Sequence, residues 1–155
     1  MQYICPLIVV ADMRRAKEFY TSVLGARIKF DFGANITFHG DFALQTLESW
    51  AEFIERSPDS VVFGAKNGEL YFEEEDIDAL ASRLAARGDI RYVHGLKEHP
   101  WGQRVLRFYD PDGHIIEVGE NLRFVCKRFL AQGMSVAKIC ERTMLPPDFV
   151  ENCRE

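Results

Sequence analysis

Residues 101–120, WGQRVLRFYDPDGHIIEVGE, place charged and aromatic side chains where they could do chemistry. The DPDG segment at 110–113 has the residues of a tight turn with a glycine bulge, so it predicts a two-stranded hairpin. In that register Arg107 lies opposite Glu117, on the same face as Tyr109. This face predicts either a cavity wall or a solvent-exposed ion pair beside a surface tyrosine. The opposite face is predicted to be core and holds Leu106, Phe108, Ile116 and Val118.

The elements that would position these residues occur twice in the order β-α-β-β-β. The first copy is predicted as a strand, a helix and three strands, at 3–10, 13–24, 27–32, 35–39 and 42–47. The second copy is predicted at 69–73, 77–87, 90–96, 103–109 and 114–119, with a short helix at 50–56 in the linker. Asp12 and Asp76, which cap the two helices, are 64 residues apart (76 − 12 = 64). The spacing predicts two modules, at about 1–49 and 67–120.

The repeat relates four polar positions to one another. At the offset of 64 Cys5 corresponds to Glu69, and at an offset of 72, which aligns the last strands, Gln45 corresponds to Glu117. Two modules packed together would bring these four residues to one site. Neighbouring carboxylates repel each other, so one keeps a proton, or a cation or Arg107 offsets the charge. We therefore predict Glu69 and Glu117 as the chemical centre, and expect Glu117→Gln to relieve the repulsion and raise thermal stability.

Five aromatic side chains could line an apolar pocket: Tyr71, Tyr109, Trp101, Phe38 and Trp50. We predict that Tyr71, Tyr109 and Trp101 contact a substrate together with Arg107, which would stabilise an oxyanion or a substrate carboxylate. Plainer roles stay open. The aromatic residues could be ordinary core, Cys5 a small buried apolar residue, and Arg107 the ion-pair partner of one glutamate.

The composition is that of an ordinary globular protein and excludes several classes. The 155 residues are 47% hydrophobic and 28% charged, with a net charge of −5. This charge offers no electrostatic footprint for nucleic acid, and no apolar run is long enough for a membrane span. We expect no signal peptide, a cytoplasmic location, and free thiols at the four cysteines, Cys5, Cys126, Cys140 and Cys153.

Residues 121–155 predict a helical extension that follows the paired modules of residues 1–120. Helices are expected at 121–132, 136–143 and 146–152. The segment GMSVAKICERTMLPPDFV resembles a helix-turn-helix, but a DNA reader should be more basic and should carry a longer third helix. We expect instead an appendage that packs on the modules or on a partner subunit, and no nucleic-acid partner.

The paired modules, the segment DMRRAKEFYTSVLG and the DPDGH hairpin together resemble the vicinal oxygen chelate superfamily, which includes glyoxalase I, extradiol dioxygenases and bleomycin-resistance proteins. Over about residues 1–120 the resemblance implies an α+β fold whose modules form a curled, barrel-like mixed sheet around a pocket. It implies metal ligands at the positions of Cys5, Gln45, Glu69 and Glu117. Only Glu117 matches the usual ligand, and histidines are common where Cys5 and Glu69 stand. Either Glu69 and Glu117 hold a divalent metal, or there is no cofactor.

Three functions follow from these expectations. The first is a glyoxalase-like enzyme, a lyase, isomerase or dioxygenase, with Glu69 and Glu117 as base and acid. The second is a non-catalytic protein that sequesters a small compound such as a drug. The third is a ligand sensor whose tail contacts DNA. The expected partners are a small-molecule ligand and a second copy of the chain in a homodimer, without a membrane.

Overall fold

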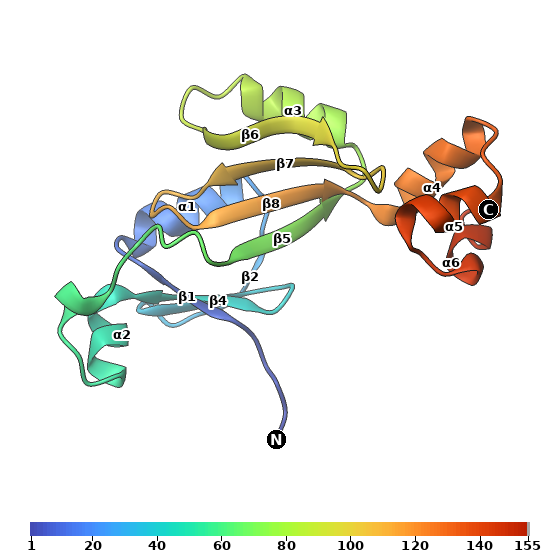
Figure 1. Ribbon diagram of the computed structural model, residues 1–155. Helices are drawn as coiled ribbons and strands as arrows, with labels where there is room; N and C mark the ends of the chain where they lie inside the picture. Colours follow the sequence, from blue (N-terminus) through green and yellow to red (C-terminus); the bar gives the residue numbers. More distant parts are fainter. Residues whose placement is uncertain (155) are drawn as a thin grey trace. The chain divides into compact units, whose positions relative to one another are not determined.

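The computed structural model describes residues 1–154, and the chain divides into two compact units. The first consists of residues 1–68 together with the turn 110–114, and the second of residues 69–109 with the chain from 115 onward. Each unit has one four-stranded mixed sheet and one β-α-β-β-β module (Figure 1). The predicted α+β fold and its internal repeat are therefore confirmed.

The first unit contains the sheet β1-β4-β3-β2, in which β1 runs parallel to β4. Its elements are β1 (Leu7–Val10), α1 (Met13–Ser22), β2 (Ile28–Asp31), β3 (Asn35–Phe38), β4 (Phe42–Thr46), α2 (Leu47–Phe53) and the short 3₁₀ helix η1 (Pro58–Ser60). Two predicted boundaries were wrong. The first strand begins at Leu7 rather than Tyr3, because Pro6 cannot donate a ladder hydrogen bond and Tyr3 stays exposed. The linker helix begins directly after β4 rather than at Trp50.

Helix α1 covers one face of this sheet through aromatic packing. The Asp12 side chain accepts a hydrogen bond from the Arg15 amide at 2.9 Å, which confirms the predicted cap. The buried Tyr20 ring packs against Phe38 and Phe42, with centroid distances of 5.9 and 5.6 Å. The apolar stripe of α1 thus forms the core of the first unit.

The second unit repeats the arrangement in the sheet β5-β8-β7-β6, with β5 parallel to β8. Its elements are β5 (Glu69–Glu74), α3 (Ile77–Ala85), β6 (Arg91–Glu98), β7 (Arg104–Tyr109) and β8 (Ile115–Glu120). Arg107 lies opposite Glu117, as the turn predicted. The four residues assigned to the core face are at most 2% exposed: Leu106, Phe108, Ile116 and Val118. Their alternation leaves Arg107 and Glu117 on the other face.

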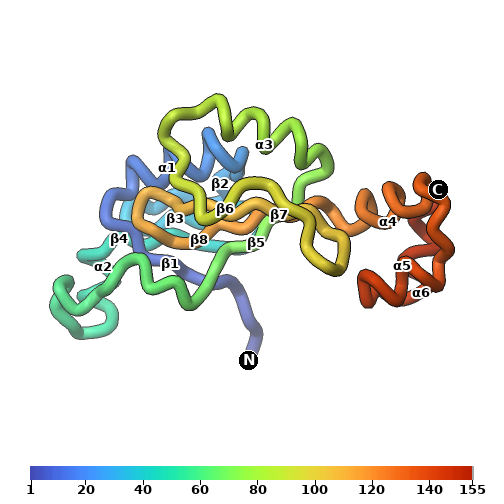
Figure 2. Tube along the Cα trace, turned by 45° about the horizontal axis from the view of Figure 1, so that its top comes forward, coloured from blue at the N-terminus to red at the C-terminus, as the bar shows by residue number. Residues whose placement is uncertain are grey.

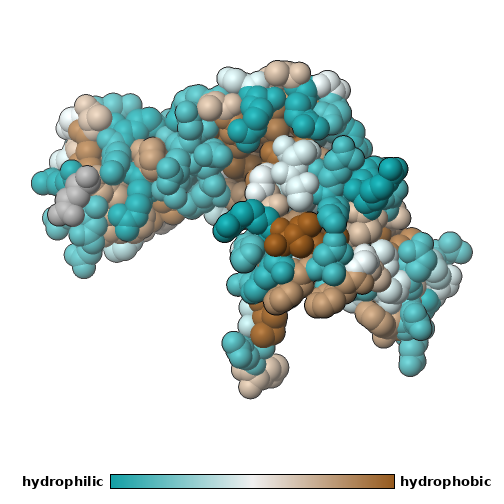
Figure 3. All heavy atoms as spheres, turned by 180° about the vertical axis from the view of Figure 1, so that it is seen from behind, coloured by the Kyte–Doolittle hydropathy of each residue, from teal (hydrophilic) through white to brown (hydrophobic). Residues whose placement is uncertain are grey.

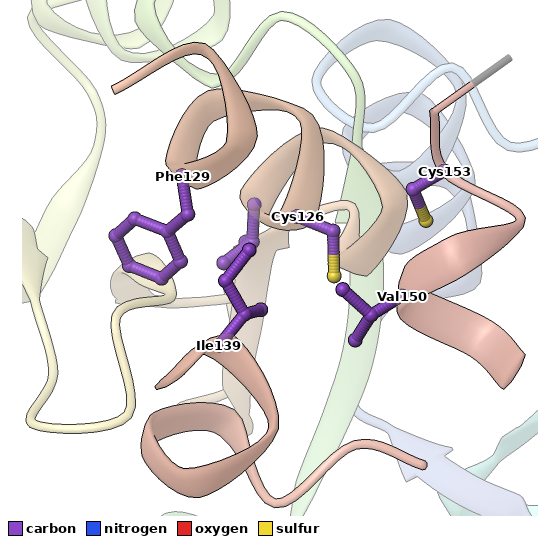
Figure 4. Packing of buried hydrophobic residues seen from close by; sticks show 6 residues of the cluster. Cys126, Phe129, Ile139, Val150 and Cys153 are labelled. Carbon is purple, nitrogen blue, oxygen red and sulfur yellow. The ribbon is translucent and has the colours of Figure 1, made fainter. Parts of the chain in front are cut away.

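Three C-terminal helices complete the second unit: α4 (Leu122–Ala131), α5 (Val136–Thr143) and α6 (Pro147–Glu151). Figure 4 shows side chains from all three directed at one another, and the buried cluster consists of Val125, Cys126, Phe129, Ile139, Val150 and Cys153. Hydrophilic residues cover much of the outer surface of these helices (Figure 3). Burial raises the pKa of the Cys126 thiol to about 12, so this thiol is unreactive at neutral pH.

The cysteines are free thiols, as expected, at Cys5, Cys126, Cys140 and Cys153. Among residues 1–154, no helix combines the length and the apolar character needed to cross a bilayer.

The C-terminal helices hold the loop between β6 and β7, which lies beside them in Figure 2. Arg128 donates to the Gly102 carbonyl at 2.6 Å, and Arg142 donates to Glu98 at 2.5 Å. Arg128 also bonds both carboxylate oxygens of Glu120. Gly102 has a φ of +89°, and the Phe129 ring fills the space that a side chain there would need. The extension is therefore fixed to the end of the sheet by charge pairs and by one close backbone contact.

The turn at 110–114 is built around the buried carboxylate of Asp110. It accepts hydrogen bonds from the amides of Asp112 and His114 at 2.9 and 2.8 Å, and from the Tyr20 hydroxyl at 2.9 Å. The His114 ring Nδ1 lies 2.8 Å from it. Burial lowers the pKa of His114, but the hydrogen bond and charge of Asp110 outweigh it and raise that pKa above its usual value.

This turn predicts a stability change with pH. A group whose pKa is higher in the folded than in the unfolded state stabilises the fold below its unfolded pKa and loses that contribution as pH rises through the folded pKa. The free energy of unfolding should therefore decline as pH rises above the unfolded histidine value of about 6.5. Asp110→Ala should remove this decline and cost about 1–3 kcal/mol, because the buried Tyr20 hydroxyl loses its acceptor. Urea titrations at several pH values would measure both effects, and an unchanged pH dependence in the variant would contradict the assignment.

Candidate functional site

Arg107 is the centre of a polar cluster on the second sheet. Its Nε donates to Glu69 at 2.9 Å, and its Nη2 donates to Glu117. Its Nη1 lies 3.3 Å from the Nε2 atom of His94 and 3.4 Å from that of His99. A second contact from Nη2 reaches Glu69 at 3.5 Å. Every N–H of the guanidinium therefore points at one of four surrounding side chains.

The hydrogen bonds around His94 determine which of its nitrogens carries the proton. Its Nδ1 is 2.8 Å from the carbonyl of Gly95, which can only accept, so Nδ1 carries the hydrogen. The Nε2 lone pair then accepts from Arg107. In this tautomer His94 presents the Nε2 lone pair to the guanidinium.

His99 is held by aromatic stacking. Its ring lies 4.3 Å from the Trp101 ring at an interplanar angle of 7°. Burial, with the positive charges of Lys97 and Arg107, lowers the pKa of His99 below its usual value. A neutral imidazole at pH 7 follows, with Nε2 directed at the cluster. Trp101 in turn donates its indole N–H to Gln103 at 3.2 Å.

Tyr71 lies opposite Glu117 in the register of β5 and β8. Its hydroxyl accepts from Gln103 at 2.8 Å and donates to Glu73 at 2.9 Å. A side chain at Gly119 would collide with Tyr71 and Gln103, so glycine is needed there for the ring to lie close to the sheet. Tyr71 and Trp101 thus both hydrogen-bond to Gln103, and they lie at the edge of the cluster.

Tyr109 and the candidates from the first unit have other surroundings. Tyr109 packs under Arg91, whose guanidinium carbon lies 5.5 Å from the ring centroid. Gln45 is buried, accepts from Asn35 at 2.8 Å and donates to Ser49. Cys5 is partly exposed and lies two residues before β1. Their participation in a site with Glu69 and Glu117 stays a prediction.

The strand registers correct the equivalence of Cys5 and Glu69. The cross-strand pairs Asn35–Gln45 and Arg107–Glu117 match at an offset of 72 (107 − 35 = 72 and 117 − 45 = 72). Ala43 and Ile115 then correspond, and their partners are Leu7 and Glu69, which are 62 apart. The segment from Glu69 to the cap Asp76 in the second module is therefore two residues longer than the segment from Leu7 to the cap Asp12 in the first module. The cap spacing of 64 matches Glu69 with Cys5, whereas the strand pairing matches Glu69 with Leu7.

The donor groups of the cluster do not fit a divalent metal as they stand. Both carboxylates and both imidazole lone pairs face the positively charged Arg107, which fills the space between them. Within either unit, residues 1–154 contain no group of three His, Cys, Asp or Glu side chains spaced to hold a metal. The chemistry that this cluster supports therefore rests on its own side chains.

A family model described as a glyoxalase-like domain matches residues 3–123. The chain belongs to this glyoxalase-like family. The predicted membership of the vicinal oxygen chelate superfamily is thereby confirmed. A comparison with curated proteins gave no match.

Solved structures share the glyoxalase-like fold. A protein of unknown function from Agrobacterium tumefaciens str. C58 is 42% identical, with a TM-score of 0.71 and coverage of 78% of this chain and 94% of that one. A member of the glyoxalase/bleomycin resistance protein/dioxygenase superfamily from Sphaerobacter thermophilus DSM 20745 is 28% identical, with a TM-score of 0.60 and coverage of 78% and 98%. A glyoxalase/bleomycin resistance protein/dioxygenase from Nocardioides, at 24% identity and a TM-score of 0.62, covers 77% and 83% and shows the fold alone.

Sequence reasoning missed the two histidines of the glyoxalase-like domain that contact Arg107. His94 pairs with Arg107 across β6 and β7, but register irregularities on both sides of it hide this partner from simple counting. His99 follows the end of β6 and reaches the cluster from the loop. The sequence did offer one signal. His94 lies in the strand that must pair with the strand of Arg107, and His99 follows that strand.

The cluster predicts a coupled pair of stability changes. Arg107→Met should lower the free energy of unfolding by about 1–3 kcal/mol, because two adjacent carboxylates lose their shared cation. Glu117→Gln alone should also destabilise, contrary to the expectation from the sequence, because Arg107 already offsets the repulsion. In the double variant, Glu117→Gln should recover part of the loss. Urea unfolding of the four proteins gives the coupling energy, and strictly additive effects would contradict this arrangement.

Proposed function

We propose that this glyoxalase-like protein binds a small carbonyl compound beside Arg107 and moves a proton on it, as a lyase or isomerase. The observation that carries the proposal is the unequal exposure of the two carboxylates on one arginine. The Glu69 side chain is 36% exposed, whereas that of Glu117 is 9% exposed. Glu69 is accessible to a ligand, whereas the more buried Glu117 can hold the Arg107 side chain in position.

In the proposed reaction, the charge and the solvent exposure of each side chain determine its role. Glu69 takes a proton from the carbon next to the carbonyl, and the electron pair moves onto the carbonyl oxygen. Arg107, anchored by Glu117, stabilises the negative charge that develops on that oxygen, which replaces one of the long Nη1 contacts with His94 and His99 at 3.3 and 3.4 Å. The proton then returns from Glu69 to a neighbouring carbon, or a leaving group departs. The neutral His99 offers a second acceptor for a hydroxyl proton of the substrate.

A second candidate is a non-catalytic protein that sequesters a small basic compound. Two carboxylates share one arginine, so the cluster carries a net negative charge when both histidines are neutral. The Trp101 ring, stacked on His99 and 40% exposed, offers an apolar platform beside this charge. A basic aromatic ligand would suit both features.

Two further proposals concern the assembly of the protein and its C-terminal helices. We keep a homodimer as the expected assembly. A DNA-contacting sensor is the weakest alternative, because α6 has only five residues and its first turn carries Asp148 rather than a base-reading side chain.

Hydrogen exchange on carbon tests the proposed chemistry without knowledge of the product. Small aldehydes, ketones and 2-oxo acids that raise the melting temperature would be incubated with the protein in D2O and followed by NMR. We expect loss of the C–H signal next to the carbonyl, slowed about 100-fold or more by Glu69→Gln.

Glu75→Gln is the matched control, because it makes the same change at an exposed position just after β5. Its exchange rate should equal that of the unmodified protein. Binding without exchange would overturn the enzymatic proposal in favour of sequestration. Equal rates in the Glu69→Gln variant would remove Glu69 from its role.

A further inference from the structure

The C-terminal helices carry a groove that lies outside the glyoxalase-like match, which ends at residue 123. Its volume is about 590 Å³, within the range of roughly 300–1,000 Å³ that small-molecule sites occupy. Helix α4 and the turn after it form one side, and the chain beyond α6 forms the other. The described residues that line the groove are Lys127, Leu130, Gly133, Met134, Cys153 and Arg154.

The apolar part of this groove follows from the way α4 ends. The amides of Gly133 and Met134 donate to the carbonyls of Leu130 and Phe129 at 2.9 and 3.0 Å, and Gly133 adopts the left-handed φ of +79° that this helix ending needs. Leu130 and Met134 both pack on the buried cluster of the three helices and stay partly exposed. A side chain at Gly133 would meet no atom within 4 Å, so the groove is open there. Two apolar side chains thus offer a floor for a hydrocarbon chain.

Two cations border this floor without a charged partner among the residues that the structure describes. Lys127 belongs to α4 and Arg154 follows α6; both are exposed, and neither side chain has an ion pair or hydrogen bond with a described residue. By contrast, Arg128 of α4 is paired with Glu98 and Glu120. No described lining residue is an Asp or Glu, although the chain has a net charge of −5. The groove is therefore a local positive site in an acidic protein.

We propose that this groove binds a small anionic amphiphile, a carboxylate with a hydrocarbon chain. The carboxylate lies between Lys127 and Arg154, because an ammonium and a guanidinium both donate charge-assisted hydrogen bonds to such a group. The chain covers Leu130 and Met134 and removes their exposed apolar surface from water. Met134 can adapt to chains of different length, since its side chain is unbranched and flexible. The groove shares no residue with the Arg107 cluster, and the inference does not depend on the reaction proposed above.

A dissolved ligand suits this groove better than a membrane surface does. Recognition of anionic membranes uses clusters of about four to eight Lys or Arg residues. The described lining of this groove has two, Lys127 and Arg154. On the face seen in Figure 3, hydrophilic residues cover much of these helices, so that face offers no broad apolar surface for insertion into a bilayer.

Calorimetric titration of the full chain with hexanoate, octanoate and decanoate, each below its micelle-forming concentration, tests the inference. The affinity should rise about 2- to 4-fold for each added methylene, because each methylene removed from water adds a similar increment. Octanol, which has the chain without the charge, should bind at least about 10-fold more weakly than octanoate. In NMR spectra of the backbone amides, octanoate should move the signals of Gly133 and Met134 and leave that of Arg107 unchanged.

The double variant Lys127→Gln/Arg154→Gln removes both cations and keeps the apolar floor. Its octanoate affinity should fall by about 10-fold or more, while its octanol affinity stays the same. Lys138→Gln/Arg83→Gln is the matched control, because it makes the same two changes at exposed positions of the same unit that do not line the groove. Its octanoate affinity should equal that of the unmodified protein.

Three outcomes would overturn the inference. One is a protein that does not bind octanoate, or binds it equally well in both double variants. Another is octanoate binding that moves the amide signal of Arg107 instead of those of Gly133 and Met134. The third is an octanoate affinity no higher than that of octanol, together with sedimentation on phosphatidylglycerol vesicles or a dimer that is lost in Lys127→Gln/Arg154→Gln. That result would assign the groove to a bilayer or to a second copy of the chain.

Discussion

The register of the β7–β8 hairpin is the constraint on which the candidate site depends. Side chains alternate along a strand, so a slip of one residue would send Arg107 and Glu117 into the core and bring Phe108 out. The Asp110 carboxylate opposes such a slip because it bonds the amides of Asp112 and His114 and fixes the length of the turn. Local turn chemistry therefore decides which side chains can meet across the sheet.

Charge pairing organises the side chains on the face of the sheet that carries Arg107 and Glu117. One arginine serves two carboxylates, and two imidazoles complete its hydrogen bonds. Guanidinium geometry suits this role because its N–H groups diverge in one plane and can reach several acceptors at once. A lysine would concentrate its charge at one point and could not replace these directed contacts. The cluster thus has an ordered interior although its outer carboxylate, Glu69, stays partly exposed.

Local signals were enough to predict most of the fold and part of the candidate site. Asp12 and Asp76 cap helices through side-chain hydrogen bonds, as their positions predicted. The Arg107–Glu117 pair followed from turn chemistry and alternation. The error at Cys5 arose because equal spacing of helix caps does not guarantee equal strand registers. His94 could not be found by counting, because irregular pairing breaks the period of two.

The family match ends at residue 123, so most of the C-terminal extension lies outside it. Arg128 and Arg142 of this extension nevertheless hold Glu98 and the Gly102 carbonyl, on either side of His99. The loop that delivers His99 to Arg107 is therefore stiffened by residues beyond the matched domain. Substitutions in α4 or α5 can alter the mobility of this imidazole without altering any side chain that touches the arginine. In this protein, the position of an imidazole that contacts Arg107 thus depends on residues outside the matched domain.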